Sequence, residues 1–397
     1  MDSLGWPGLE GNKNKWWLWK PCIVATHPKL DEDAILSVAL LELSGARIKG
    51  YWFRGEGDEA LPPQIDFKDV LWIDRGRRVF DHHGILGKTS TDIVAEELGI
   101  ANEKWIQPIL RHVRRVDLEG RSEPMDLNEM IKSIARELNN DEEIMKLGVK
   151  IATAIINFHR NNVRRDNQKA AMIIKEFFGE EMPERIRHYF ELLQNPNFAR
   201  PCDFAELATM DTELAKEVLK FLVADIEKYQ RAMKEIKTAK RIEISGYFII
   251  VGESNNPKFN VAARQIGAAI VIQRNTTGHT QVYFNNKILG VRVEKIAEDL
   301  VECLRLREIL LDSSKKLPRI KSSLRSVGKI EEVPEWYFFK GEKGGCLILN
   351  GSLTSPDVPP TKIPLEEIAE FAVDVLKNVS ENKGKRKGFG NKALSHH

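Results

Sequence analysis

The stretch T-H-P-K-L-D-E-D-A-I-L-S-V-A-L-L at residues 26–41 decides the fold of the first half of the chain. The apolar run 22–26 predicts a buried strand that ends at this stretch, and the run 34–43 predicts a buried helix that follows it. A strand, a polar loop and a helix in this order are typical of a parallel α/β sheet. Such sheets bind ligands at the carboxyl ends of their strands, and three loop side chains would lie there: His27, Asp31 and Asp33.

Two further apolar runs end in polar residues within V-L-W-I-D-R-G-R-R-V-F-D-H-H-G at residues 70–84. The run 70–73 leads into Asp74, and the short run 79–80 leads into the triplet Asp81-His82-His83. Three such strand ends side by side would gather two histidines and at least three carboxylates in one place. That is the composition of a two-metal site for phosphoryl chemistry.

Each of these segments also has an ordinary structural interpretation. The loop with Asp31 and Asp33 can be a solvated turn that caps the next helix, and Asp74 can simply start a turn. The triplet is the sharpest signal, because its two histidines can divide between metal and substrate while Asp81 holds one imidazole in the correct tautomer. Asp117, at the end of a predicted helix, is either a further carboxylate ligand or a plain helix-end residue.

The periodicity of apolar residues divides the rest of the chain. A strand at 48–53, a loop at 55–63 and a helix at 91–98 continue the α/β alternation. From about residue 103 to 240 the period is 3.6, which predicts helices at 106–116, 127–138, 141–158, 170–178, 183–193 and 212–239. After residue 241 the pattern predicts strands at 247–251, 268–273, 280–284 and 345–350, with helices at 293–306 and 365–379.

Bulk composition is that of a globular chain with two domains. The 397 residues are 42% hydrophobic and 30% charged, with no run of eighteen apolar residues, so we expect no membrane span. The four cysteines show no CxxC spacing, which argues against a zinc knuckle or a disulfide framework and fits a reducing, cytoplasmic location. A net charge of +2 argues neither for nor against a polyanionic partner.

Two segments of the second half have both a bland and a functional interpretation. Residues 275–280 are either a hairpin turn or a polar loop that meets substrate through His279. Residues 344–352 are either a strand with turns or a group of backbone amides and small polar side chains that hold a phosphate or ribose. The residues concerned there are Asn350, Gly351 and Ser352.

Taken together, the first-half motifs resemble those of the DHH phosphoesterase superfamily. That superfamily contains manganese-dependent pyrophosphatases, single-strand exonucleases, oligoribonucleases and cyclic-dinucleotide phosphodiesterases. The stretch at 26–41 and the stretch at 70–84 look most like the melanocyte-proliferating-gene (MYG) type exonucleases, and the segments at 270–284 and 344–353 are similar more loosely. The resemblance implies an α/β fold with a parallel-sheet DHH-type catalytic domain, followed by helices and a smaller C-terminal α/β domain.

Position by position, the resemblance also implies roles for the residues. His27 and Asp31 would bind a first Mn²⁺ or Mg²⁺ ion; Asp33, His82 and Asp117 would bind a second; Asp74 would bridge the two. His83 would face the scissile phosphate, supported by Asp81. Arginines near the motifs could contact backbone phosphates or be solvated surface charges: Arg75, Arg77, Arg78, Arg111, Arg114 and Arg115.

Three departures from the family pattern concern the substrate. The opening HxxxDxD spacing is closer to that of pyrophosphatases, Asn350 stands where the MYG-type segment has histidine, and the GGGH element of many DHH-associated domains is missing. We therefore predict a catalytic domain with a helical extension at 17–210, an interdomain helix at 211–242, a substrate-binding domain at 243–380 and a disordered tail at 381–397.

The expected activity is 3′–5′ hydrolysis of single-stranded RNA, DNA or short oligonucleotides, with the exonuclease character implied by the resemblance alone. One alternative is a small-molecule phosphohydrolase acting on pyrophosphate, polyphosphate or a cyclic dinucleotide, which the HxxxDxD spacing favours. Another is a metal-stabilised nucleic-acid-binding protein without catalysis. The sequence does not fix the oligomeric state, and a homodimer is one possibility.

Overall fold

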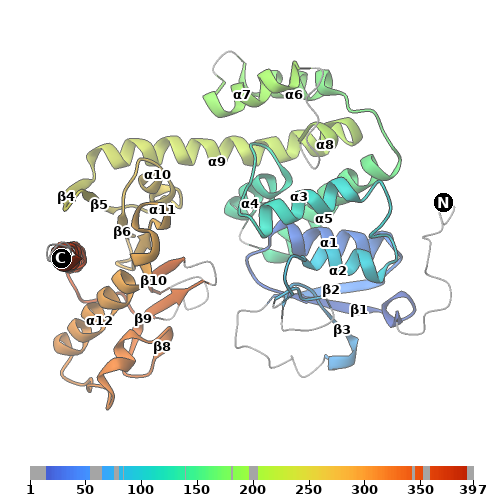
Figure 1. The fold of residues 1–397 in the computed structure, drawn as a ribbon. Helices are drawn as coiled ribbons and strands as arrows, with labels where there is room; N and C mark the ends of the chain where they lie inside the picture. The colour runs from blue at the N-terminus through green and yellow to red at the C-terminus, as the bar shows by residue number, and fades with distance from the viewer. Residues whose placement is uncertain are drawn as a thin grey trace, which may run out of the picture. The chain divides into compact units, whose positions relative to one another are not determined.

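The computed structural model describes residues 15–53, 65–75, 80–83, 85–138, 140–179, 182–195, 204–341, 345–351 and 358–390. The chain divides into two compact units, Met1–Ile226 and Glu227–His397, each of which is described by itself (Figure 1). The division falls inside the long helix α9 (Thr212–Thr238), within the segment that the sequence assigns to an interdomain helix.

A small parallel sheet carries the sequence motifs of unit 1. Its strands are β1 (Cys22–Thr26), β2 (Ile48–Phe53) and β3 (Val70–Trp72), in the order β2-β1-β3. Both pairings are parallel, as the strand–loop–helix pattern predicts. The expected strand at 79–80 is present in the described residues only as a parallel bridge between Ile73 and Phe80, and Val79 lies outside them. These strand ends place the three motifs at one edge of the sheet.

Helices α1 (Glu32–Leu43), α2 (Ser90–Glu97) and α5 (Asp141–Arg160) pack on and beside this sheet (Figure 1). Helix α1 is buried on all sides from Glu32 to Leu41, which explains its nearly unbroken apolar sequence. Gly148 lets α5 approach α1 closely, because a Cβ atom at this position would lie 2.6 Å from Cδ1 of Ile35.

The remaining helices of unit 1 form the predicted helical extension. They are α3 (Gln107–Asp117), α4 (Leu127–Glu137), α6 (Asn167–Phe178), α7 (Glu184–Leu193) and α8 (Phe204–Met210). The sequence predicts each of them except α8, whose seven residues are too few to show a 3.6 period.

Unit 2 is built on a mixed sheet with the strand order β4-β5-β6-β7-β10-β9-β8. The strands are β4 (Lys240–Ile244), β5 (Tyr247–Glu253), β6 (Ile270–Arg274), β7 (Thr280–Phe284), β8 (Gly328–Ile330), β9 (Val333–Lys340) and β10 (Cys346–Asn350). Only β5 and β6 pair in parallel among these strands.

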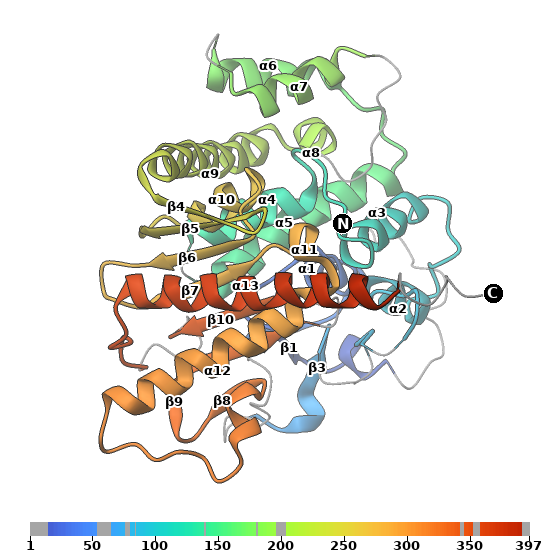
Figure 2. The same cartoon turned by 60° about the vertical axis from the view of Figure 1, so that its left-hand side comes forward.

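Helices cover both faces of this sheet. Helices α12 (Val293–Leu311) and α13 (Leu365–Gly390) share a core with Ile272, Val282 and Ile348 (Figure 2). The short helix α10 (Phe259–Gln265) and the end of α9 pack on Ile250 and Val271, which alternate onto the opposite face. The short helix α11 (Asn286–Leu289) follows β7.

The structure differs from the sequence-based expectation at several elements of unit 2. Strands β4, β8 and β9 and helices α10 and α11 were not predicted; in β9, Pro334 and Glu335 interrupt the apolar alternation. Helix α13 continues to Gly390, beyond the point where the predicted disordered tail begins, and residues 391–397 lie outside the described residues. None of the described helices combines the length and apolar character needed to cross a bilayer.

Candidate metal centre

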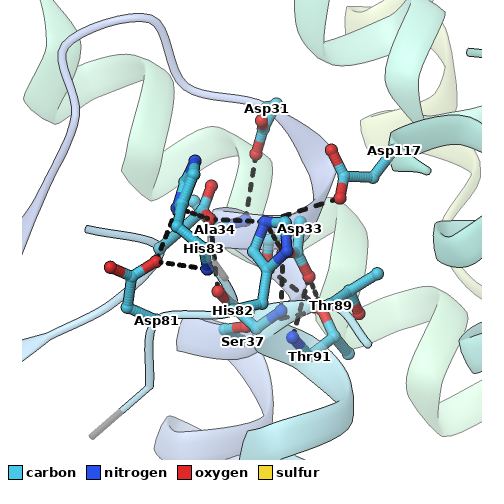
Figure 3. Close-up of polar contacts among 12 residues, drawn as sticks. Asp31, Asp33, Ala34, Ser37, Asp81, His82, His83, Thr89, Thr91 and Asp117 are labelled. Atoms are coloured by element: carbon cyan, nitrogen blue, oxygen red, sulfur yellow. Dashed lines mark hydrogen bonds and ion pairs between the residues drawn. The ribbon is translucent and has the colours of Figure 1, made fainter. Parts of the chain in front are cut away.

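The three motifs and the end of α3 bring their polar side chains together at the carboxyl ends of β1 and β3. Figure 3 shows Asp31, Asp33, His82, His83 and Asp117 around one small volume. The residues that the sequence singles out and the structure assembles are His27, Asp31, Asp33, Asp74, Asp81, His82, His83 and Asp117. The predicted convergence of segments far apart in the chain is therefore present.

Asp74 lies at the centre of this group and faces a different histidine with each carboxylate oxygen. Its Oδ2 is 3.1 Å from Nε2 of His27, and its Oδ1 is 3.1 Å from Nε2 of His82. The residue is 5% exposed and has a left-handed backbone conformation with φ of 53°. Asp tolerates this region better than most residues, and the conformation allows the chain to turn sharply as it leaves the strand.

Two groups of ligand atoms lie on either side of Asp74. In the first, Nε2 of His27 lies 3.7 Å from Oδ2 of Asp31. In the second, Nε2 of His82 lies 3.5 Å from Oδ2 of Asp117 and 3.9 Å from Oδ2 of Asp33. Within each group the donor atoms are no more than 4.8 Å apart, close enough to hold one ion.

The donor set fits hard or borderline divalent cations. Carboxylate oxygens with imidazole nitrogens suit Mn²⁺ and, where oxygen predominates, Mg²⁺, whereas the thiolates that soft metals prefer do not occur in these groups. A single carboxylate that faces both groups is the arrangement expected for a bridging ligand in a two-metal site.

Helix α2 holds Asp33 firmly in place through its N-terminus. The backbone N–H groups of Ser90 and Thr91 donate to Oδ2 and Oδ1 of Asp33 at 2.8 and 2.7 Å, and the Thr91 hydroxyl donates to Oδ1 at 2.6 Å. The positive end of the helix dipole favours a carboxylate there. Thr89 is the N-cap of α2 and forms a capping box with Asp92.

Asp81 and His83 form a separate hydrogen-bonded pair at the edge of the group. Oδ1 of Asp81 accepts from Nδ1 of His83 at 2.6 Å and from its backbone N–H at 3.1 Å. The pair fixes the imidazole with its proton on Nδ1, which leaves Nε2 for another partner. The His83 side chain is 48% exposed, whereas that of His82 is only 14% exposed. The two neighbouring histidines thus differ in exposure, and their division between metal and substrate stays a prediction.

Charge in the group is dominated by carboxylates, and the pKa values respond to this. Burial disfavours the imidazolium of His27, but Asp31 and Asp74 outweigh it and raise its pKa to about 10. The hydrogen bond with Asp74 raises the pKa of His82 to about 9. Burial and the neighbouring Asp74 and Asp31 carboxylates raise the pKa of Asp33. The protonated imidazoles thus partly neutralise the negative charge of the carboxylates, which divalent cations would neutralise further.

Asp74 itself behaves in the opposite way. Burial alone would raise the pKa of its carboxyl group, but the hydrogen bonds and charges of His27 and His82 overcome this effect and hold the pKa well below its usual range. The neighbouring histidines thus favour the ionised form of Asp74, which is the form that binds a metal ion.

The arginines near the motifs differ in their availability to a substrate. Arg114 is held in a bidentate ion pair with Asp92, with Nε and one terminal nitrogen 3.0 and 2.6 Å from its oxygens. Arg115 lies 3.7 Å from Glu123, and Arg111 is exposed. Arg75 is partly buried beside Asp74, whereas Arg77 and Arg78 lie outside the described residues.

Three candidate substrate residues of unit 2 lie within the described residues: His279 and Gly351 pack against each other, and Asn350 binds backbone groups. The ring of His279 accepts or donates through Nδ1 with the Thr277 hydroxyl at 2.8 Å and donates through Nε2 to the Val358 carbonyl at 2.9 Å. It also packs on Gly351, where a Cβ atom would lie 2.7 Å from the ring and where φ is +74°. Residues 275–280 form the predicted hairpin turn between β6 and β7.

Asn350 is fully buried, and its carboxamide is bonded to backbone groups. Its Nδ2 donates to the carbonyls of Glu335 and Pro359, and its Oδ1 accepts from the N–H of Thr361. These bonds fix the chain around the end of β10. Ser352, the last candidate of this group, lies outside the described residues.

Sequence reasoning missed two polar contacts that surround the centre. The capping box at Thr89 and Asp92 had a readable signal in the T-S-T-D spacing. The contact between Glu32 and His112 had none, because the two residues are 80 positions apart and each looks like an ordinary helix residue.

Comparison with known proteins gives little beyond this geometry. No family model matches the chain, and no curated protein matches it. Among solved structures it is similar to PggH from Vibrio cholerae, a pGpG-specific phosphodiesterase, with a TM-score of 0.38 and 12% identity over 72% of this chain and 88% of that chain. An uncharacterized protein from Helicobacter pylori G27 matches with a TM-score of 0.25 and 12% identity over 70% and 89% of the two chains. Similarity at these TM-scores establishes neither a shared fold nor a shared function.

Proposed function

We propose that this protein is a metal-dependent phosphodiesterase that hydrolyses single-stranded RNA, DNA or short oligonucleotides from the 3′ end. The observation that carries the proposal is the position of Asp74, whose two oxygens each lie 3.1 Å from a different histidine. A ligand group lies on each side of it, one with His27 and Asp31 and the other with Asp33, His82 and Asp117. A pair of Mn²⁺ or Mg²⁺ ions fits this donor set.

Divalent cations held in this way supply Lewis-acid activation of water and neutralise the charge of a phosphate. The protein's own part is to hold the carboxylates in fixed positions where they bind the cations. Without the cations these carboxylates would repel an anionic substrate. His83 adds a group that can touch the substrate. Its Nδ1–H donates to Asp81, and this hydrogen bond raises the pKa of the ring, so the protonated imidazole can donate from Nε2 to a phosphate oxygen.

The preference for oligonucleotides rests on the resemblance of the motifs to the MYG-type exonucleases. The HxxxDxD spacing of His27, Asp31 and Asp33 is the specific observation that favours a second candidate, a phosphohydrolase of pyrophosphate, polyphosphate or a cyclic dinucleotide. Both candidates use the same metal centre, so the substrate panel must separate them.

The test is a digest of end-labelled RNA and DNA, linear and cyclic dinucleotides and pyrophosphate with Mn²⁺ titrated into the protein. Asp74→Asn is compared with Asp166→Asn, a matched change at the N-cap of α6 whose amide can still accept from Lys169 N–H. We expect mononucleotide release from the 3′ label, lost in Asp74→Asn and kept in Asp166→Asn. Hydrolysis of pyrophosphate alone would select the second candidate, and equal product ladders from wild type and Asp74→Asn would refute the role of the centre.

A further inference from the structure

A buried acid–base pair, Glu32 with His112, connects helix α1 to helix α3. Both helices carry candidate metal ligands. Oε2 of Glu32 lies 3.2 Å from Nε2 of His112, and the two residues are 1% and 2% exposed. Glu32 stands in the first turn of α1, between Asp31 and Asp33. His112 lies in α3, whose last residue is Asp117.

Arg115 fixes the direction of this hydrogen bond. Its terminal nitrogen lies 3.3 Å from Nδ1 of His112, and a guanidinium can only donate, so Nδ1 must accept. The proton of the imidazole is then on Nε2, which donates to the Glu32 carboxylate. The imidazole therefore lies between a cation and an anion in one defined tautomer and orientation, with little freedom to rotate.

The pair completes a ring of three polar connections among α1, α2 and α3. The N-terminus of α2 binds the Asp33 carboxylate, which connects α1 to α2. The bidentate pair of Asp92 with Arg114 connects α2 to α3. The contact of Glu32 with His112 connects α3 back to α1 and closes the ring.

Stability alone does not account for a carboxylate at this position. Oε1 of Glu32 is buried and has no hydrogen-bond partner in the part of the chain that the structure describes. A buried ion with one unbonded oxygen is costly, and an apolar pair of similar volume would often be at least as stable. An apolar pair would, however, lack the directional contact that sets the position of α3 along and around its axis.

We propose that Glu32 and His112 are positioning residues that fix α3, and with it Asp117, relative to Asp33 for the ion held by Asp33, His82 and Asp117. The inference rests on the proposed metal centre but concerns one of its two ligand groups. The group of His27, Asp31 and Asp74 contains no residue of α3, so a displacement of α3 moves none of its ligands.

The test is calorimetric titration of the full-length protein with Mn²⁺, combined with thermal unfolding. In Glu32→Leu/His112→Phe an apolar pair replaces the connection. We expect two Mn²⁺ binding steps, of which only one loses about 10- to 100-fold in affinity. A loss of this size is typical when a group that orients a metal ligand is removed. The melting temperature should not fall. Glu32→Gln, whose side-chain oxygen can still accept from Nε2 of His112, should restore most of the lost affinity.

A second pair of the same composition, a buried glutamate with a partly buried histidine, provides the control. Oε2 of Glu206 in α8 lies 3.0 Å from Nε2 of His159 in α5, with Arg165 3.1 Å from the other oxygen. Neither helix carries a candidate ligand. Glu206→Leu/His159→Phe should leave both binding steps unchanged whatever it does to the melting temperature.

The outcomes separate the inference from the proposed function. Two unchanged binding steps in Glu32→Leu/His112→Phe, or equal weakening of both steps, would overturn the positioning role. If that variant does not fold, the same comparison is made with His112→Gln, and the same two results would overturn it. A wild-type protein that binds no Mn²⁺ would refute the proposed metal centre itself, and the inference with it.

Discussion

The carboxylate of Asp74 and the imidazole of His82 lie 3.1 Å apart although the two residues are eight positions apart in the chain. The Asp74 N–H donates to the Phe80 carbonyl, so the backbone at Phe80, two residues before His82, lies directly beside Asp74. The same carboxylate reaches His27 from the β1 loop with its other oxygen. One buried side chain thus links the three motifs, and it is the natural target for the first prediction.

Asp74→Asn should remove both Mn²⁺ binding steps, because the substituted amide offers one neutral oxygen in place of two charged ones. We expect loss of measurable binding at the concentrations that saturate the wild type. Calorimetry measures this directly, and retention of one full step would show that Asp74 serves only one ligand group.

Binding of Mn²⁺ should release protons. The pKa values of His27 and His82, raised to about 10 and about 9, mean that both rings carry a proton at pH 7.5, whereas a metal needs the lone pair of Nε2. Affinity should therefore rise with pH between 6 and 9, by up to about two log units per pH unit. Titrations in buffers of different ionisation enthalpy count the protons, and heats independent of the buffer would contradict the prediction.

Asp81→Asn should lower activity while it leaves metal binding intact. The neutral amide removes the charge that raises the pKa of His83, so the ring loses the protonated form that can donate from Nε2 to a phosphate oxygen. We expect a fall in kcat of about 100-fold or more, the usual scale for a misoriented general acid–base group. Unchanged kcat would remove His83 from contact with the reacting phosphate.

Removal of metal by a chelator should abolish hydrolysis without unfolding the protein. Hydrogen bonds from Ser90 and Thr91 hold Asp33, and Asp81 holds His83, without any ion. Circular dichroism should therefore show the same helical signal before and after chelation, and added Mn²⁺ should restore activity within the mixing time. Loss of the signal on chelation would show that the centre is needed for folding.

Gly148→Ala should destabilise unit 1, because the new Cβ atom would lie 2.6 Å from Cδ1 of the fully buried Ile35. Overpacking of this kind costs about 1–3 kcal/mol, partly offset by the better helix propensity of Ala. Gly50→Ala is the control, since nothing lies within 4 Å of a Cβ atom there. A denaturant titration should show a lower midpoint for the first variant only; equal midpoints would mean that α1 and α5 can move apart freely.

Much of the fold and the centre could be predicted because both follow from local patterns. Strand ends of a parallel sheet meet at one edge, so apolar runs that end at His27, Asp74 and Asp81 predict their convergence. The helices of unit 1 were long enough to show their period. Strand β9 was missed because Pro334 and Glu335 break its alternation, although Glu335 is buried in the structure.

The contacts that hold the ligands could not be predicted, because they join residues that share no local pattern. Thr91 reaches Asp33 across 58 positions and His112 reaches Glu32 across 80. Each is decided by the packing of whole helices, which a single sequence does not reveal. Asn350 shows the opposite case: a polar residue at a strand end looked suited to a ligand, but its carboxamide binds the backbone of its own unit.

The hydrogen bonds from the N-terminus of α2 to Asp33 have a consequence for the order of folding and metal binding. Because backbone N–H groups already hold this carboxylate in the absence of metal, the region around Asp33 can fold before an ion binds. An ion bound at the proposed centre would then enter after folding, and the supply of manganese and magnesium would influence which of them is bound.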